Sequence, residues 1–333
     1  MNALFARVIG GTPLDAEDSA HAFDVIMSGH ADPVQVEAFL AAQAARGPTV
    51  DELIGAAQAM RARMLTIEAP AEAVDLCGTG GDGQDTLNIS TAVSFVVAGA
   101  GIPVAKHGNR GASSHSGAAD VLAALGVKIE LEPRQAEACL RRAGLCFLFA
   151  QRYHPAMRHV AEIRKRIKSR TIFNLLGPIC NPARVRRQLI GVFAPEWLAP
   201  FAEVLAALGA DRAWIVHGAD GLDELSTTGD SLAFVMQEGA RVVRPEDAGI
   251  ARGGIEQIRG GDASFNAAAI RRLLGGERDA YRDIVLLNAA ATLIVAGRAA
   301  GLAQGAALAA EAIDSGAAQA ALDKLIETSN MAP

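Results

Sequence analysis

The stretch that organises this chain reads DLCGTGGDGQDTLNIST at residues 75–91 and, after an apolar run, VAKHGNRGASSHSGAAD at residues 104–120. Each part begins with a short apolar run typical of a strand, continues into a loop rich in small polar residues, and leads into a segment of helical character. Glycines let backbone N–H groups approach an anion, and the N-terminus of the following helix adds partial positive charge. Together with the charges of Lys106 and Arg110, the two loops predict a site for a substrate with several phosphates.

Outward from these loops, short runs rich in Val, Ile, Leu and aromatic residues alternate with helical segments. Strands that alternate with helices need crossover connections, so the pattern predicts an α/β fold with a mainly parallel central sheet covered by helices. Residues 232–244 instead predict a hairpin at the sheet edge, and the chain from Asn266 onward predicts Ala-rich helices. The expected strands are 74–77, 102–106, 127–131, 145–150, 189–194 and 213–217.

Residues 1–68 carry helical patterns only. Asp15, Asp32 and Thr49 each precede an apolar-periodic run, as N-cap residues do. We therefore expect a small all-helical N-terminal domain at 1–68 and a large α/β domain at 69–333.

One insertion near 155–187 interrupts the alternation. Residues 155–167 have apolar side chains at helical spacing and predict an amphipathic helix, which continues into RTIFNLLGP at 170–178. We expect this insertion to return to the helical domain, with the functional site in the cleft between the two domains.

The composition is that of an ordinary globular protein, with 333 residues, of which 50% are hydrophobic and 20% charged. A net charge of −6 gives no reason to expect a nucleic-acid partner or an anionic membrane. Residues 152–187 nevertheless hold ten Lys or Arg against one acidic residue, Glu162. Such a block is usually a solvated face, but beside a phosphate site it would steer an anionic substrate.

The cysteines and the first residues favour a reducing compartment. Cys77, Cys139, Cys146 and Cys180 form no C-x-x-C pair, and MNALFAR lacks the features of a signal peptide, so we expect a cytoplasmic protein. Uncharged apolar tracts such as 284–297 fall short of the ~20 residues that a membrane span needs, so none is expected.

A dinucleotide site must also be considered, because GTGGDG at 78–83 fits G-x-G-x-x-G. A Rossmann site needs an acidic residue about 20 positions further on to hold the ribose hydroxyl. The chain has Lys106 and His107 there, and a base favours phosphate over a nicotinamide dinucleotide. The absence of P-loop and G-x-S-x-G motifs removes kinase-like and hydrolase-like functions.

Two groups of polar residues stand where ligands are expected. Asn88, Ser90 and Thr91 lie where a helix should begin; an N-cap is their commonest role, but three in succession offer more donors and acceptors than a cap needs. Asp223 and Glu224 follow an expected strand. Such a pair is usually solvated surface, yet parallel sheets bind ligands beyond the carboxyl ends of their strands, where adjacent carboxylates suit Mg2+.

Arg164 lies on the shoulder of the apolar stripe of 155–167. Its side chain either snorkels along that stripe or directs a guanidinium fork into the cleft, where it would suit a carboxylate. His107 and His154 are candidates for acid or base. Neither has an orienting partner in the sequence, so we interpret both as positioning residues.

With these residues assembled, the chain resembles the anthranilate phosphoribosyltransferase family over nearly its whole length. Several long motifs in the right order are far more specific than any one of them. The motifs are IMSG at 26–29, GTGGDG at 78–83, NIST at 88–91, KHGNR at 106–110, RTIFNLLGP at 170–178 with Asn-Pro at 181–182, and VHGADGLDELS at 216–226.

The resemblance implies a homodimer formed through the helical domain, and Mg2+-dependent transfer of the 5-phosphoribosyl group from phosphoribosyl pyrophosphate to the amine of anthranilate, in tryptophan biosynthesis. Lys106, Asp223 and Glu224 would be catalytic, with Mg2+ held by Ser90, Asp223 and Glu224. Anthranilate would contact Gly78, Asn109, His154 and Arg164. Phosphoribosyl pyrophosphate would contact Gly78, Gly81, Asp82, Thr86, Asn88, Ile89, Ser90, Thr91, Lys106, His107, Gly108, Asn109, Arg110, Gly111, Ala112, Ser113, Ser114 and Ala118.

Two positions depart from the family pattern. Ala118 stands where a Ser or Thr donor is expected, so one phosphate hydrogen bond would be missing or supplied by Ser116. His115 stands where a basic residue, often Lys, is expected, so pyrophosphate affinity, or its dependence on pH, would differ. Two alternatives remain at this point: a pyrimidine nucleoside phosphorylase, which shares the architecture, and a non-catalytic relative that binds nucleic acid through the basic block at 152–187.

Overall fold

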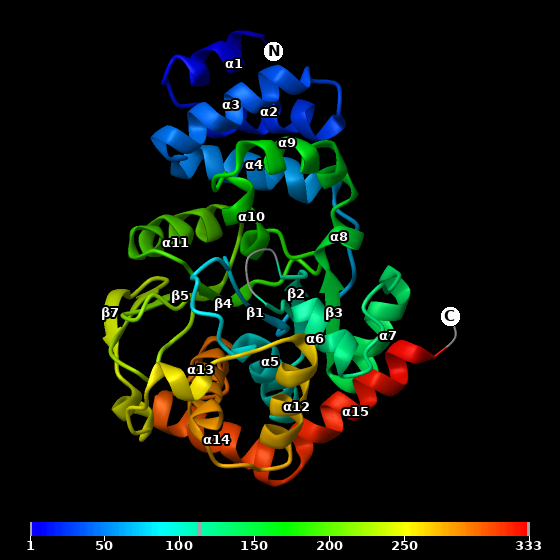
Figure 1. The fold of residues 1–333 in the computed structure, drawn as a ribbon, viewed down its shortest axis with the longest axis vertical. Coiled ribbons are helices and arrows are strands. Elements are labelled where there is room, and N and C mark those ends of the chain that lie inside the picture. The colour runs from blue at the N-terminus through cyan, green and yellow to red at the C-terminus, as the bar shows by residue number, and fades with distance from the viewer. Residues whose placement is uncertain (1, 112–114, 332–333) are drawn as a thin grey trace.

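The computed structural model describes residues 2–111 and 115–331, and it has two bodies stacked along its long axis (Figure 1). A helical bundle formed by the N-terminal helices lies at one end, and an α/β body lies at the other. The crossover segment with α9 (Ala161–Ile167) and α10 (Phe173–Ile179) runs between them. All four cysteines are free. Within the described ranges, no helix has the length and apolar character that crossing a membrane requires.

Side chains cap the helices of the bundle as the sequence predicts. Asp15 accepts a hydrogen bond from the backbone N–H of Asp18, and Asp32 accepts one from that of Val34. Thr49 forms a capping box at the start of the last helix. The helices are α1 (Asn2–Ile9), α2 (Ala16–Ser28), α3 (Pro33–Arg46) and α4 (Val50–Arg63).

The α/β body is built on one seven-stranded sheet in the order β3-β2-β1-β4-β5-β6-β7. The strands β1 to β5 are parallel, whereas β6 and β7 each run antiparallel to the strand before them, so the mainly parallel sheet and the edge hairpin are confirmed. The strands are β1 (Val74–Gly78), β2 (Val104–Gly108), β3 (Leu145–Phe149), β4 (Arg187–Gly191), β5 (Arg212–Gly218), β6 (Ser231–Val235) and β7 (Gly239–Val243).

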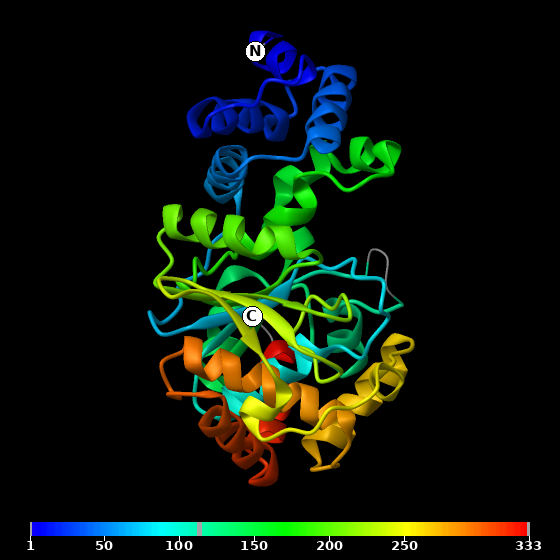
Figure 2. The same ribbon diagram turned by 90° about the vertical axis from the view of Figure 1, so that its left-hand side faces the viewer.

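Helices cover both faces of this sheet (Figure 2). Ile190 and Ile215 are buried in an apolar cluster that continues through α10 and α11 into the helical bundle, whereas Leu189 and Trp214 are buried in the cluster on the other face. Successive side chains of a strand point to opposite faces, so each strand serves both clusters. The remaining helices are α5 (Ile89–Gly99), α6 (Ala118–Ala124), α7 (Pro133–Ala143), α8 (Ala150–Tyr153), α11 (Leu198–Ala207), α12 (Ala263–Leu274), α13 (Ala280–Val295), α14 (Leu302–Asp314) and α15 (Ala317–Asn330).

The strand expected at 127–131 is wrong. Val127, Ile129 and Leu131 are buried in alternation with exposed neighbours, so the period of two correctly indicated which side chains are buried. The segment nevertheless joins no sheet, because the backbone N–H of Lys128 donates to the side chain of Ser329 on the C-terminal helix rather than to a strand.

The single helix expected at 155–167 is also wrong, because it divides at Val160 into a 3-10 turn, η1 (Pro155–His159), and α9. Val160 and Ile163 are still buried in the cluster that includes the bundle. Arg166 of α9 donates to Glu37 of α3 at 2.7 Å, so the insertion packs on the N-terminal helices.

Candidate active site

A cleft of about 680 Å3 opens at the carboxyl ends of β1, β2 and β4, between the sheet and the crossover segment. Ligands of parallel sheets bind in this position. The predicted site residues that line the cleft are Gly78, Gly81, Asp82, Thr86, Asn88, Ile89, Ser90, Lys106, His107, Gly108, Asn109, Arg110, Gly111, Ala118, Arg164, Asp223 and Glu224.

The glycine-rich loop after β1 turns through backbone conformations that favour glycine. Gly80, Gly81 and Gly83 have φ of +68°, +77° and +73°. The N–H of Gly80 donates to Oδ2 of Asp223 at 2.7 Å. A carboxylate thus already occupies one N–H of the predicted phosphate site, which shows that this loop presents donors to an anion.

The start of α5 is held by hydrogen bonds to two distant segments of the chain. Asn88 stands at the N-cap position, but its side chain makes no capping hydrogen bond. It donates instead to the Ser116 carbonyl at 3.1 Å and accepts from the Asn266 amide at 2.8 Å, so an ordinary capping role is wrong for Asn88. The Thr91 hydroxyl is fully buried without a hydrogen-bond partner among the described residues, away from the cleft surface.

Lys106 is buried beneath the cleft floor, with 2% of its surface exposed. Its Nζ donates to the Leu76 carbonyl at 2.8 Å and to Oγ of Ser90 at 3.2 Å. Burial raises the pKa of Asp75 and the charge of Lys106 opposes that rise. The ammonium therefore acts as a fixed positive charge at the end of β2, with Ser90 positioned by it.

Asp223 and Glu224 face the same floor from the loop after β5. Burial, reinforced by the charge of Asp82, raises the pKa of Asp223 to about 6, and burial, reinforced by Asp223, raises that of Glu224 to about 8. These neighbouring carboxylates repel one another because little positive charge lies near them. A divalent cation bound between them would neutralise that repulsion.

Two glycines leave the room that the acidic loop needs. A Cβ on Gly78 would lie 2.0 Å from Oδ2 of Asp223, and one on Gly191 would lie 1.5 Å from its carbonyl oxygen. Among the described residues, no group of three or more His, Cys, Asp and Glu side chains could enclose a metal on its own. Mg2+ does not require one, because it binds through one or two carboxylates together with water and phosphate oxygens.

Arg164 reaches the cleft from the opposite side. Its guanidinium lies 5.6 Å from the ring centroid of Phe173. Burial lowers its pKa and is the only influence on it, so within the described part of the chain no carboxylate compensates its charge. A half-buried arginine without a partner anion has the chemistry to bind a ligand carboxylate.

Comparison with known proteins places these features in a family. Residues 2–64 match the glycosyl transferase family, helical bundle domain, and residues 70–319 match the glycosyl transferase family, a/b domain. An anthranilate phosphoribosyltransferase of Methylocella silvestris is 54% identical to this chain, and the match covers 100% of this chain and 96% of the relative. An anthranilate phosphoribosyltransferase of Parvibaculum lavamentivorans is 56% identical, and that match covers 98% of this chain and 97% of the relative. The chain belongs to the anthranilate phosphoribosyltransferase family.

Solved structures agree with this membership. An anthranilate phosphoribosyltransferase from Thermus thermophilus superimposes with a TM-score of 0.95 at 41% identity, covering 98% of this chain and 99% of that one. The Saccharomyces cerevisiae anthranilate phosphoribosyltransferase, solved in complex with PRPP and Mg, superimposes with a TM-score of 0.92 at 26% identity, covering 98% and 97%.

Several residues that the family resemblance implies lie elsewhere. Ala112, Ser113 and Ser114 lie outside the described residues. His154 is buried behind His107, with their Nε2 atoms 3.2 Å apart, and is not part of the cleft surface. Its expected contact with anthranilate therefore stays a prediction, and His107 supplies the orienting partner that the sequence did not reveal.

The two positions that depart from the family pattern lie near the second loop. Nε2 of His115 is 3.8 Å from Oδ2 of Asp85, so a charge on the imidazole would pair with the first loop. Ala118 begins α6 and lines the cleft. The nearby Arg110 pairs with Asp120 of α6 at 2.7 Å, so in this structure its charge is neutralised by that helix rather than free in the cleft.

Arg170, Asn174 and Phe193 are among the cleft residues that the sequence analysis missed. The first two belong to RTIFNLLGP, whose length and position between the two bodies were the available signal. Phe193 follows β4, and no pattern in the sequence distinguishes it from core residues.

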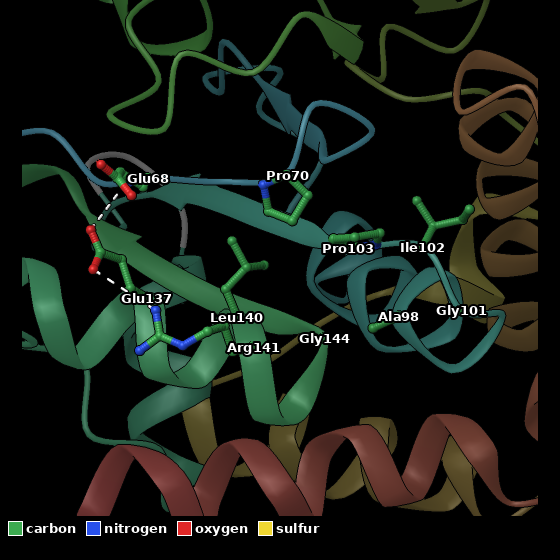
Figure 3. Close-up of a pocket in the computed structure, with 10 residues that line it drawn as sticks. All are labelled: Glu68, Pro70, Ala98, Gly101, Ile102, Pro103, Glu137, Leu140, Arg141 and Gly144. Atoms are coloured by element: carbon green, nitrogen blue, oxygen red, sulfur yellow. Dashed lines mark hydrogen bonds and ion pairs between the residues drawn. The ribbon is translucent and has the colours of Figure 1, made fainter.

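A second, smaller pocket of about 300 Å3 lies at the amino ends of the parallel strands, where β1, β2 and β3 begin (Figure 3). Its charged residues are engaged with one another: Glu137 accepts from the N–H of Glu68 at 3.0 Å and lies 4.0 Å from Arg141. The rest of the lining is mostly apolar and holds no group suited to the family's chemistry.

Proposed function

We propose that this chain transfers the 5-phosphoribosyl group from phosphoribosyl pyrophosphate to the amine of anthranilate, releasing pyrophosphate, in tryptophan biosynthesis. One observation supports it above the others: a single cleft has anion-binding loops and an acidic pair on one side and the uncompensated Arg164 on the other. A phosphorylated donor and a carboxylate-bearing acceptor would therefore meet between them.

The donor would lie on the loops after β1 and β2. The backbone N–H groups of the glycine-rich loop would donate hydrogen bonds to the phosphates of phosphoribosyl pyrophosphate, and the N-terminus of α5 would add partial positive charge. The remaining predicted donor contacts, including those at Thr91 and at 112–114, are proposals that follow the family resemblance.

Mg2+ would be held by Asp223 and Glu224, with Ser90 beside them. The raised pKa values of both acids fit this role, because a cation would favour their ionised forms. When bound, Mg2+ neutralises charge on the departing pyrophosphate. Lys106 would add a fixed positive charge on the same side, and such preorganised stabilisation is usually the largest catalytic contribution.

Anthranilate would bind with its carboxylate toward Arg164 and its amine toward C1 of the ribose. The amine is a weak nucleophile and becomes acidic only as its bond to C1 forms, so holding it in line does much of the work. His107 is not suited to act as the base, because burial lowers its pKa to about 3. Asn109 and Gly78 line the same cleft and would contact the bound anthranilate.

We further propose a homodimer formed through the helical bundle. Ile9 of α1 and Val34 of α3 are 49% and 75% exposed, and apolar side chains so exposed on neighbouring helices suit a partner surface. Sedimentation should give twice the chain mass, and Val34→Asp should shift it toward the monomer. The cytoplasmic location stays a prediction.

The transfer reaction is tested directly with the intact protein. Mixed with anthranilate, phosphoribosyl pyrophosphate and Mg2+, it should make anthranilate fluorescence disappear, and omission of any one component should prevent this. Persistent fluorescence together with phosphate-dependent release of base from thymidine would instead identify a nucleoside phosphorylase.

A further inference from the structure

We propose that Arg170 is a positioning residue for the donor. Lining the same cleft, it holds the glycine-rich loop 79–83 and ties that loop to the crossover segment that carries Arg164. This inference rests on the proposed function, since it concerns the site where the donor would bind.

Arg170 makes two contacts that meet in one loop. Its Nη2 donates to the carbonyl oxygen of Gly81, and its guanidinium carbon lies 3.8 Å from the ring centroid of Phe193. The backbone N–H of Phe193 in turn donates to Oγ1 of Thr79 at 3.0 Å. Arg170 and Phe193 therefore pack against each other, and each makes one hydrogen bond to the loop, at Gly81 and at Thr79.

The loop needs such support because its own sequence gives it little rigidity. Gly80, Gly81 and Gly83 all adopt positive φ, and glycine has the largest backbone freedom to lose. A phosphate site requires N–H groups turned toward the anion and carbonyl oxygens turned away. Because a peptide is planar and trans, holding the Gly81 carbonyl also fixes the direction of the Asp82 N–H.

The position of the guanidinium depends on the missing side chain at residue 81. A Cβ on Gly81 would lie 3.1 Å from Nη2 of Arg170, which is closer than most such contacts allow. Position 81 therefore requires glycine for two reasons: its backbone has a positive φ, and the guanidinium of Arg170 occupies the space that a side chain would need.

Arg170 differs from the ordinary surface arginines of this chain. Arg186, which is exposed as Arg170 is, pairs with Asp211 at 2.6 Å, and such pairs contribute little. Within the described residues, Arg170 instead contacts a backbone carbonyl and an aromatic ring. A planar guanidinium can stack and donate at the same time, which a lysine ammonium does not reproduce.

The backbone next to Arg170 is anchored in the crossover segment. Thr171 is 4% exposed, and its N–H donates to the side chain of Asn174 at 2.9 Å. Arg164 lies six positions before Arg170, on α9. A shift of this segment that moves Arg164 would therefore be passed to the glycine-rich loop, and so to the donor.

The test measures donor binding by calorimetry, with phosphoribosyl pyrophosphate and Mg2+ and without anthranilate. Arg170→Ala should raise the donor Kd about tenfold, the size expected for losing one charge-assisted hydrogen bond with its stacked ring. Arg170→Lys should recover less than half of that loss. Thermal unfolding and the KM for anthranilate should change little.

Phe193→Leu separates positioning from direct contact with the donor. It should weaken donor binding in the wild-type background and have almost no further effect in Arg170→Ala, because the two side chains act as one support. The matched control is Arg186→Ala, an exposed arginine that also donates to a backbone carbonyl, that of Gly209 at 2.9 Å, at the other end of β4. It should leave donor binding unchanged.

Unchanged donor Kd in Arg170→Ala, equal weakening of both substrates, or additive effects of the two substitutions would each overturn this inference. Failure of the proposed function is a separate result: it would appear in the wild-type protein as absence of phosphoribosyl transfer, before any variant is compared.

Discussion

The Nε2 atom of His107 lies 3.2 Å from the Nε2 atom of His154, and Nδ1 of His107 lies 3.0 Å from the carbonyl oxygen of Gly177. A carbonyl only accepts hydrogen bonds, so Nδ1 of His107 carries the proton and its Nε2 accepts one from His154. Burial lowers the pKa of His107 to about 3 and that of His154 to about 4. Two neutral rings therefore fix each other's orientation beneath the acceptor side of the cleft.

This pairing predicts a loss of stability in acid. Unfolded histidines bind protons below about pH 6.5, while these two remain neutral in the folded protein until the pH approaches 4. Their contribution is present above pH 6.5 and is lost as the pH falls toward 4. His154→Asn should consequently cost about 2 kcal/mol less at pH 5 than at pH 7 in denaturant unfolding. Exposed His21→Asn is the control, and an equal cost of His154→Asn at both pH values would refute the pairing.

The acidic pair predicts opposite effects on stability and activity. In the folded protein the pKa of Glu224 is raised to about 8. The unfolded chain therefore releases this proton at a lower pH than the folded chain does. As a result, Glu224 lowers the free energy of unfolding as the pH rises from about 4 to 8. Glu224→Gln, alone or with Asp223→Asn, should raise the melting temperature at pH 8 in the absence of Mg2+. The same variants should no longer show the rise in melting temperature that Mg2+ causes in the wild-type protein. Turnover should fall strongly.

Glu203→Gln, on an exposed face of α11, is the matched control for these acids. It should alter neither the melting temperature nor the Mg2+ requirement. If the Asp223→Asn, Glu224→Gln variant kept a normal Mg2+-dependent rate, these residues would have no part in holding the metal.

Arg164→Ala should raise the KM for anthranilate by tenfold or more, since a charge-assisted hydrogen bond contributes about 1.5–3 kcal/mol. The KM for phosphoribosyl pyrophosphate should change little, because the donor loops lie across the cleft. Initial rates with each substrate varied in turn measure both constants. Arg166→Ala, on the same helix but bonded to Glu37, is the control. An equal rise in both KM values would make Arg164 a structural residue or a phosphate ligand.

Gly191→Ala should disrupt the acidic loop. The added methyl group would lie 1.5 Å from the carbonyl oxygen of Asp223, a backbone atom that no side-chain rotation can move away. We expect a loss of about 2–4 kcal/mol in unfolding free energy and loss of the Mg2+-induced stabilisation. Gly301→Ala has open space at the same position and should be nearly neutral. Normal Mg2+ dependence in Gly191→Ala would mean that the acidic loop tolerates displacement.

Much of this protein was determined by its sequence. The caps at Asp15, Asp32 and Thr49 and the strands of the parallel sheet follow from side-chain chemistry and apolar periods that act over a few residues. The glycine-rich loops and the acidic pair were recognisable for the same reason, because a phosphate or metal site needs particular residue types in short succession.

Only the tertiary structure decided which groups face one another. The period of 127–131 showed which side chains are buried, but not that the side chain of Ser329 on a helix, rather than a strand, would accept the hydrogen bond of Lys128. His107 meets His154 across 47 positions, and Arg170 meets Gly81 across 89. A local pattern tells which side of a segment is buried, whereas the partner that buries it depends on contacts between distant parts of the chain. The orientation of the histidine pair and the support of the donor loop were therefore not visible before the chain was folded.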